Sequence, residues 1–381
     1  MKPIRMVDLV SQYEKIKPEV DAAIAGVINS AIFIKGPEVK SFESNLANYL
    51  NVKQVIACAN GTDALQIAMM ALQLQPGDEV ITACFTYAAT AEVIALLHLK
   101  PVLVDVDPDT FNINIEALRA AITPRTKAIV PVHLFGQCAD MEPLLKIAQE
   151  HNLFVIEDCA QAISAEYTFS DGRKARAGTM GNIGTTSFFP SKNLGCFGDG
   201  GALYTNDEKL AKDIRSIANH GQSQLYYHDK VGVNSRLDAI QAAILNVKLK
   251  SLDQYGQARV EAANYYDQAF ANHKNLKTPF RAPYSTHIFH QYTLKLCGVD
   301  RDVLKAHLES ANIPMMIYYP VPLNEQKVYL QEGNFSVTKE LCQCVFSIPM
   351  HTELEKDQLE CITKTILEFL SNTNNISISN K

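Results

Sequence analysis

The stretch TTSFFPSKNLGCFGDGGALYT, residues 185–205, decides how the rest of the chain is interpreted. Its flanks, TTSFF and GALYT, are rich in the β-branched and aromatic residues of short strands. Between them stands Lys192, followed by glycines that let the backbone turn sharply, Gly195, Gly198, Gly200 and Gly201. We therefore predict a constrained connection that holds the lysine amine over the end of a sheet. A lysine held in this way can react with carbonyl groups, whereas most loop lysines are simply solvated.

The composition is that of an ordinary globular chain. Of its 381 residues, 47% are hydrophobic and 20% are charged, which allows two domains with a substantial core. A net charge of -6 leaves no basic surface, so we expect neither nucleic acid nor membrane as a partner. The apolar runs are too short to span a bilayer and the N-terminus lacks a signal-peptide pattern, so we expect a cytoplasmic protein. The nine scattered cysteines include no CxxC pair, which favours reduced thiols and no metal site.

Short apolar segments alternate with helical patterns in the first half of the chain. The predicted strands are residues 55–59, 79–83, 102–106, 128–132, 154–159, 185–189 and 201–205. Because helices separate most of them, we predict an α/β fold with a seven-stranded, mostly parallel sheet. Ligands bind such sheets at the strand ends.

Two further regions flank this sheet in the sequence. Residues 1–50 have two helical patterns with a break at 34–37, typical of an arm that covers a larger core. A long helical region after residue 238 leads to a mixed pattern of short strands and helices. We therefore expect a large α/β domain over residues 1–250, including the arm, and a small α+β domain over residues 251–381.

A Gly-Thr turn, Gly61-Thr62, follows the first predicted strand and begins a helix. Such a turn offers free backbone N–H groups, a hydroxyl and the positive end of the helix dipole to a phosphate. Thr62 or Asp63 fits an ordinary helix N-cap equally well.

The strand at 154–159 ends in Glu157-Asp158, with Gln161 shortly after it. A buried carboxylate is costly without a cationic partner, and a protonated ring nitrogen is such a partner. A helix N-cap or a surface ion pair is the alternative explanation. Together with Lys192 and the phosphate-binding turn, Asp158 completes the set of groups that a pyridoxal phosphate site requires.

Rival motifs are missing from the sequence, which has no GxxxxGK[ST], HExxH or GxSxG. The spaced glycines Gly178, Gly181 and Gly184 precede a strand rather than open a helix. They therefore do not indicate a dinucleotide site.

Many ordered blocks between about Val7 and Leu370 together resemble one family. They are GPEVKSFE (36–43), NGTDAL (60–65), PGDEVIT (76–82), FTYAAT (85–90), KPVLVDVDPDT (100–110), TPRTKAIVPVHLFGQ (123–137), IEDCAQA (156–162), SFFPSKNLGCFGDGGAL (187–203), NHGQ (219–222), VGVNSRLDAIQAAIL (231–245) and YYPVPL (318–323). In these blocks the chain resembles the nucleotide-sugar aminotransferases of the DegT/DnrJ/EryC1/StrS group, which have the type I fold of pyridoxal-phosphate-dependent aminotransferases.

The resemblance implies a role for each residue around the cofactor ring. Lys192 would form the Schiff base with pyridoxal 5'-phosphate and shuttle the proton to and from the substrate carbon. Asp158 would pair with the pyridine nitrogen, Gln161 would contact the ring hydroxyl, and Tyr87 would stack on the ring.

The resemblance also implies a phosphate site and a second subunit. Gly61, Thr62 and Ser187 would hold the phosphate, and Asn234 would reach it from the partner. The protein would then be a homodimer with shared active sites.

For the substrate, the resemblance points to Arg236, Tyr318 and Tyr319. A dimer salt bridge for Arg236 and core or rim positions for the tyrosines remain open. The chain departs from many relatives at Tyr318 and Asn324, where they carry histidine, and this puts the substrate in doubt.

The implied function is transfer of an amino group from L-glutamate to a keto group of a nucleotide-linked sugar. Several blocks most resemble enzymes acting at C3 of UDP-2-acetamido-2-deoxy-3-oxo-hexuluronate, for surface polysaccharide such as lipopolysaccharide O-antigen. The alternative substrate is a dTDP- or GDP-linked keto-6-deoxyhexose. A non-catalytic, cofactor-binding regulator on the same fold is an alternative of another class.

Overall fold

The computed structural model describes residues 2–379, with side chains described through residue 372. Its centre is a seven-stranded sheet with the order β1-β9-β8-β5-β4-β2-β3. The strands are β1 (Gln54–Cys58), β2 (Glu79–Ala83), β3 (Lys100–Val104), β4 (Thr126–Val130), β5 (Phe154–Asp158), β8 (Ile183–Ser187) and β9 (Gly201–Thr205). Only β9 runs antiparallel to its neighbours, so the predicted mostly parallel sheet is confirmed.

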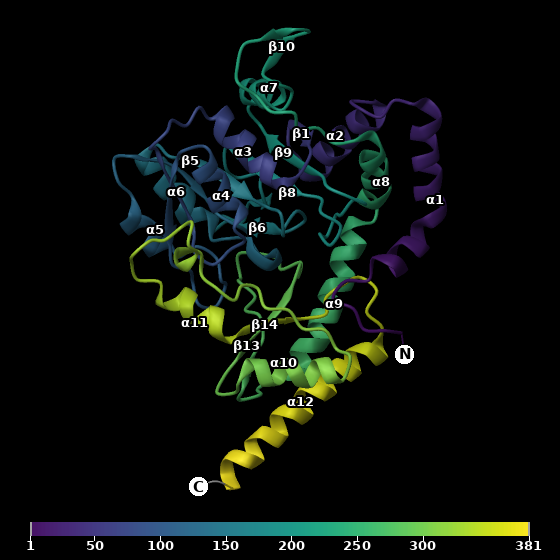
Figure 1. The fold of residues 1–381 in the computed structure, drawn as a ribbon, viewed down its shortest axis with the longest axis vertical. Helices are drawn as coiled ribbons and strands as arrows, with labels where there is room; N and C mark the ends of the chain where they lie inside the picture. The colour runs from purple at the N-terminus through teal and green to yellow at the C-terminus, as the bar shows by residue number, and fades with distance from the viewer. Residues whose placement is uncertain (1, 380–381) are drawn as a thin grey trace.

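Helices cover both faces of this sheet because its strands are apolar on both sides (Figure 1). In β1, for example, Val55 and Ala57 face one hydrophobic cluster and Ile56 faces the other. The helices of the second cluster include α3 (Gly61–Ala71), α4 (Ala89–Leu96) and α7 (Glu208–Ile217). The first cluster includes α2 (Pro37–Leu50), α5 (Ile115–Ala121), α6 (Met141–His151) and α8 (Ala239–Leu249).

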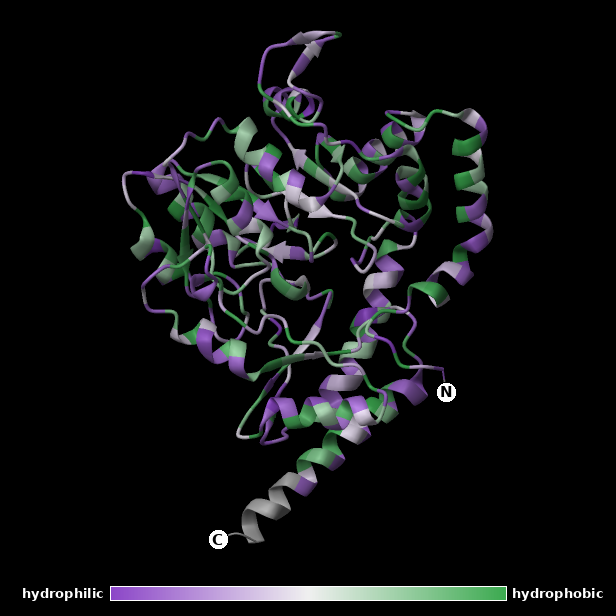
Figure 2. Ribbon diagram, viewed as in Figure 1, coloured by the Kyte–Doolittle hydropathy of each residue, from purple (hydrophilic) through white to green (hydrophobic). Residues whose placement is uncertain are grey.

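The N-terminal arm consists of α1 (Leu9–Ser30) and α2, and the break between them agrees with the sequence prediction. Hydrophobic and hydrophilic residues alternate along α1, as Figure 2 shows. Its buried residue Val27 packs with Ala239 and Ala243 of α8. The arm is thus held by one apolar stripe.

The C-terminal region has its own sheet and core. The strands β12 (Leu276–Lys277), β13 (Tyr292–Leu296) and β14 (Val345–Ile348) form an antiparallel sheet. The helices are α9 (Leu252–Phe270), α10 (Arg301–Ser310), α11 (Ser336–Cys344) and α12 (Lys356–Ser379). The boundary after residue 250 stays a prediction, since α9 contributes Leu252 to the core of the large sheet and Tyr266 to that of the small one.

Two short hairpins interrupt regions in which the sequence indicated no strands. They are β6 (Glu166–Thr168) with β7 (Lys174–Arg176), and β10 (Gln222–Gln224) with β11 (Tyr227–His228). The second hairpin stands out beyond α7 in Figure 1. Among the described residues, no helix combines the length and apolarity needed to cross a bilayer.

A buried carboxylate fixes the end of β5. Glu157 is fully buried, and its oxygens accept hydrogen bonds from the backbone N–H groups of Gly178, Met180 and Gly181, at 2.7, 2.7 and 2.5 Å. Its Oε2 also lies 2.9 Å from Nε2 of His133. Because Nδ1 of His133 accepts a hydrogen bond from the Ala139 N–H, Nε2 carries the proton and donates a hydrogen bond to the carboxylate.

This network explains one feature of the sequence and one of the structure. Gly178 and Gly181 belong to the glycine triplet, and both present their N–H groups to Glu157. His133, Glu157 and Cys159 also lie close enough together to resemble metal ligands. The protons and lone pairs of His133 and Glu157 are already used within the protein, so the cluster is a hydrogen-bond network.

We expect Glu157→Ala to lower the free energy of unfolding by about 3–5 kcal/mol, because three buried N–H groups and a histidine lose their acceptor. Urea denaturation measures this. Glu332→Ala, at an exposed glutamate, is the matched control and should change the free energy by less than about 0.5 kcal/mol. Equal effects of the two changes would contradict the structural role of Glu157.

Candidate active site

A cavity of about 570 Å³ opens where the parallel strands end. This volume lies within the usual range of small-molecule sites. The cavity brings together nine of the predicted site residues, Gly61, Thr62, Tyr87, Asp158, Gln161, Ser187, Lys192, Tyr318 and Tyr319. These residues come from distant parts of the chain, and the shared strand edge places them side by side.

Lys192 lies on the connection between β8 and β9. Its backbone N–H donates to the Phe189 carbonyl at 2.8 Å, and a Cβ on Gly195 would lie 2.3 Å from the Pro190 carbonyl oxygen, so this tight turn requires glycine. Among the described residues, the lysine amine has no hydrogen-bond or ion-pair partner. Burial lowers the pKa of Lys192 to about 8, against the opposing effect of Asp158. The amine is therefore free to react and more easily deprotonated than an exposed lysine.

Asp158 ends β5 and is 8% exposed. One oxygen accepts the Ala160 N–H at 3.0 Å and the other accepts the Thr90 hydroxyl at 3.2 Å. Burial raises the pKa of Asp158, and these hydrogen bonds and the charge of Lys192 oppose the rise. The carboxylate has no ion-pair partner in the described part of the chain, so a cation in the cavity would stabilise it.

The N-terminus of α3 forms an anion-binding edge of the cavity. Asn60, rather than Thr62 or Asp63, caps the helix, since its side chain accepts the Asp63 N–H at 2.8 Å. The preceding N–H groups of Gly61 and Thr62 have no acceptor among the described residues. A Cβ on Gly61 would lie 2.7 Å from Cβ of Ser187, so only glycine lets the two segments approach this closely.

Gln161 is held by two contacts. Its Oε1 accepts the Phe135 N–H at 2.7 Å, and its Nε2 donates to the Tyr319 hydroxyl at 3.4 Å. Tyr87 is 64% exposed and lines the cavity. It is therefore accessible to a planar ligand, whereas Tyr318 is half-buried.

Two predicted residues lie outside this cavity. Asn234 is exposed, and Arg236 lines a separate hollow of about 180 Å³ with Lys35 and Arg215. A single chain therefore does not bring them to the cofactor position. Asn324 does not line the cavity either. Its side chain accepts a hydrogen bond from the Cys84 thiol and donates one through Nδ2 to the Gln331 carbonyl.

The sequence analysis missed several residues of the cavity. Asn60 and Thr90 lie within recognised blocks, and their role follows only from the contacts above. Asp199, His290 and Gln291 also line the cavity. No local pattern singled out His290, since its loop joins the cavity from a distant part of the sequence.

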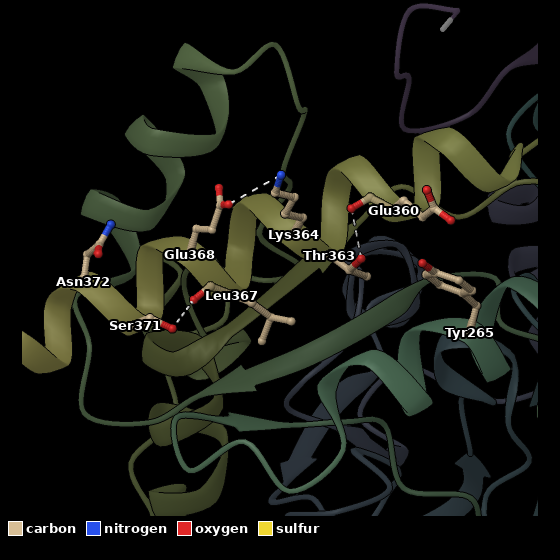
Figure 3. Close-up of a pocket in the computed structure, with 8 residues that line it drawn as sticks. All are labelled: Tyr265, Glu360, Thr363, Lys364, Leu367, Glu368, Ser371 and Asn372. Atoms are coloured by element: carbon tan, nitrogen blue, oxygen red, sulfur yellow. Dashed lines mark hydrogen bonds and ion pairs between the residues drawn. The ribbon is translucent and has the colours of Figure 1, made fainter.

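A larger hollow of about 790 Å³ lies along α12 and α9 (Figure 3). Its polar side chains interact along their own helix. Lys364 pairs with Glu368 at 3.8 Å, and the Ser371 hydroxyl donates to the Leu367 carbonyl at 2.8 Å. Because it offers no convergent reactive groups, we regard the cavity at the strand ends as the active site.

The cavity fits pyridoxal phosphate on three counts. Lys192 offers an unpartnered amine, Asp158 offers a buried carboxylate that lacks a cation, and the start of α3 offers unpaired N–H groups. These match the aldehyde, the ring nitrogen and the phosphate of the cofactor, respectively.

Comparison with known proteins agrees with this chemistry. Residues 14–367 match the model of the DegT/DnrJ/EryC1/StrS aminotransferase family. The chain is 45% identical to the UDP-2-acetamido-2-deoxy-3-oxo-D-glucuronate aminotransferase of Pseudomonas aeruginosa, over 94% of this chain and 98% of that protein. It is 44% identical to the pleiotropic regulatory protein of Geobacillus stearothermophilus, over 96% of this chain and 98% of that protein.

A solved structure is similar over nearly the whole chain. The crystal structure of S. venezuelae DesV, in complex with a ketimine intermediate, superposes with a TM-score of 0.92 at 36% identity, covering 97% of this chain and 99% of that one. The chain therefore belongs to the DegT/DnrJ/EryC1/StrS aminotransferase family and is a pyridoxal-phosphate-dependent aminotransferase.

Proposed function

We propose that this protein transfers an amino group from L-glutamate to the C3 keto group of UDP-2-acetamido-2-deoxy-3-oxo-hexuluronate, for surface polysaccharide such as lipopolysaccharide O-antigen. The main support for this reaction is that Lys192, Asp158 and the start of α3 line one cavity. The assignment of the substrate rests on the 45% identity to the Pseudomonas aeruginosa aminotransferase. The free state of all nine cysteines supports a reducing, cytoplasmic location.

The bound cofactor supplies an electron sink for the substrate carbon. Lys192 would hold the cofactor covalently and, once released, would move a proton at its Nζ to and from that carbon. Asp158 would accept a hydrogen bond from the protonated ring nitrogen, Gln161 would contact the ring hydroxyl, and Tyr87 would cover the ring face. The hydrogen bonds to Thr90 and Phe135 keep Asp158 and Gln161 in these positions.

The phosphate and the substrate require further residues. Gly61, Thr62 and Ser187 bind the phosphate, because the free N–H groups and the nearby hydroxyl form one edge of the cavity. Asn234 and Arg236 act across a homodimer interface, which is consistent with their position outside the cavity of their own chain. Arg236 grips the sugar carboxylate with its planar guanidinium.

Tyr318 and Tyr319 line the cavity, and we assign them to the substrate. A dTDP- or GDP-linked keto-6-deoxyhexose is the second candidate substrate and lacks the carboxylate. The regulator alternative gains some support from the name of the Geobacillus stearothermophilus relative.

We expect L-glutamate to convert the lysine-bound cofactor of the purified protein to its amine form, seen as a change in the cofactor absorbance. Lys192→Ala should remain folded but lose both the conversion and the covalent attachment, which borohydride reduction and intact mass detect. Lys127→Ala, at an exposed lysine on β4, is the control and should behave like the unaltered protein. A lack of conversion in the unaltered protein would favour the regulator, and turnover by Lys192→Ala would refute the assigned site.

The lowered pKa of Lys192 predicts how cofactor uptake depends on pH. Only the uncharged amine attacks a carbonyl group, so the rate at which apoprotein binds pyridoxal phosphate covalently should rise with pH, with a midpoint near pH 8, and level off above it. Stopped-flow absorbance measures this rate. A rate that keeps rising beyond pH 9 would show that the amine titrates like an exposed lysine.

We expect Arg236→Lys to lose about tenfold or more of kcat/KM on the hexuluronate, since an ammonium does not bind a carboxylate bidentately. Activity on a neutral keto sugar should change little. A panel of nucleotide keto sugars, with products identified by mass and NMR, provides both measurements. Equal losses on acidic and neutral sugars would remove the carboxylate role.

A further inference from the structure

His290 lies in the active-site cavity and has no role in the reaction described above. It is 5% exposed and reaches the cavity from the loop before β13. Its backbone N–H donates to the Phe135 carbonyl at 2.8 Å, and buried Arg259 donates to the His290 carbonyl at 3.3 Å. The ring is therefore held on a fixed loop.

The contacts of Asn193 determine which ring nitrogen of His290 carries the proton. Nδ2 of Asn193 donates to the Ile288 carbonyl at 3.3 Å, so its Oδ1 faces the other way. That oxygen lies 3.3 Å from Nδ1 of His290 and accepts a hydrogen bond from it. Nε2 is then left with an unshared electron pair.

Two complementary groups in this cavity lack partners. Nε2 of His290 has no hydrogen bond to any residue that the structure describes, and it is not sealed in the core. The amine of Lys192 is likewise unpartnered within residues 2–372. The two residues are also linked through Asn193, which follows Lys192 in the chain and bonds to the His290 ring.

We propose that Nε2 of His290 is the hydrogen-bond acceptor that positions the amine of Lys192 when pyridoxamine phosphate fills the cavity and leaves this lysine free. His290 is thus a positioning residue, which acts through Lys192. The inference rests on the proposed function only for the cofactor, whose ring nitrogen would engage Asp158, the carboxylate whose charge otherwise acts on Lys192.

The electrostatics of the cavity suit an acceptor. Burial, followed by the charges of Lys192 and Arg259, holds the pKa of His290 well below its usual range, so the ring stays neutral near pH 7. The other titratable groups that line the cavity are Asp158, Asp199, Tyr87, Tyr318 and Tyr319. Since His290 does not titrate near neutral pH, its effect on Lys192 is that of a constant acceptor.

The test compares the ionisation of Lys192 in protein loaded with pyridoxamine phosphate, in which the lysine is free. Pulses of acetic anhydride across a pH series, with mass spectrometry of the Lys192 peptide, give the midpoint of labelling. We expect His290→Asn to lower this midpoint by about one pH unit, because the shorter amide bonds to Asn193 but does not reach the charged amine. His290→Gln, whose longer side chain restores an acceptor, should move the midpoint back.

His287→Asn is the matched control. His287 lies in the same loop, accepts the Phe289 N–H at 3.1 Å and does not line the cavity. It should leave the midpoint unchanged. An unchanged midpoint in His290→Asn, or equal shifts in the Asn and Gln variants, would overturn the proposal.

A second measurement needs no variant. In unaltered protein with ¹⁵N-labelled histidine and pyridoxamine phosphate, the Nε2 signal of His290 should have the shift of a hydrogen-bonded acceptor. A shift typical of an unbonded nitrogen would overturn the proposal. Neither measurement requires turnover, so failure of glutamate or of the sugar to react would test the proposed function separately.

Discussion

The active site depends on one buried carboxylate that takes no part in the reaction. Glu157 accepts hydrogen bonds from three backbone N–H groups and from His133, and so ties the loop after β4 and the segment before β8 to the end of β5. A carboxylate without these partners would cost several kcal/mol to bury. Because Asp158 is the next residue, and alternate strand residues face opposite sides, fixing Glu157 on one side of β5 directs Asp158 to the other.

Burial then acts in opposite directions on the two charged groups of the cavity. It lowers the pKa of Lys192 and raises the pKa of Asp158, and so favours the neutral form of each. The two charges partly compensate each other, but neither has a direct ion-pair partner among the described residues. A ligand with a protonated ring nitrogen and an aldehyde would relieve both groups, because it offers a cation to Asp158 and a reaction partner to Lys192. The groups of the cavity that lack partners thus match the functional groups of pyridoxal phosphate.

The sequence predicted the sheet and nine residues of the cavity. Local patterns predicted the strands, Lys192, Asp158 and the Gly61-Thr62 turn, and the family resemblance implied the roles of Tyr87, Gln161, Ser187, Tyr318 and Tyr319. Each strand is a short apolar run, and the turn around Lys192 requires glycine where Pro190 approaches Gly195. The parts that escaped prediction depend on tertiary contacts. Thr90 and His290 gain their positions only when distant segments meet. Asn60 is the exception, because its cap on the Asp63 N–H is a local contact and asparagine is a preferred N-cap residue. Asn234 and Arg236 lie outside the cavity of one chain, so their predicted roles await a second subunit.

The state of Lys192 also bears on whether the fold serves catalysis or only binding. A regulator that senses the cofactor needs the phosphate site, the ring contact and the carboxylate, all of which are present without the lysine. Keeping an amine in a site that disfavours its charge destabilises the protein, and a use for the neutral amine would explain why the site retains it. The neutral amine is the form that attacks a carbonyl group and accepts a proton from carbon. The environment of Lys192 therefore supports the proposed role of this residue as base and nucleophile, and a purely regulatory role leaves its burial unexplained.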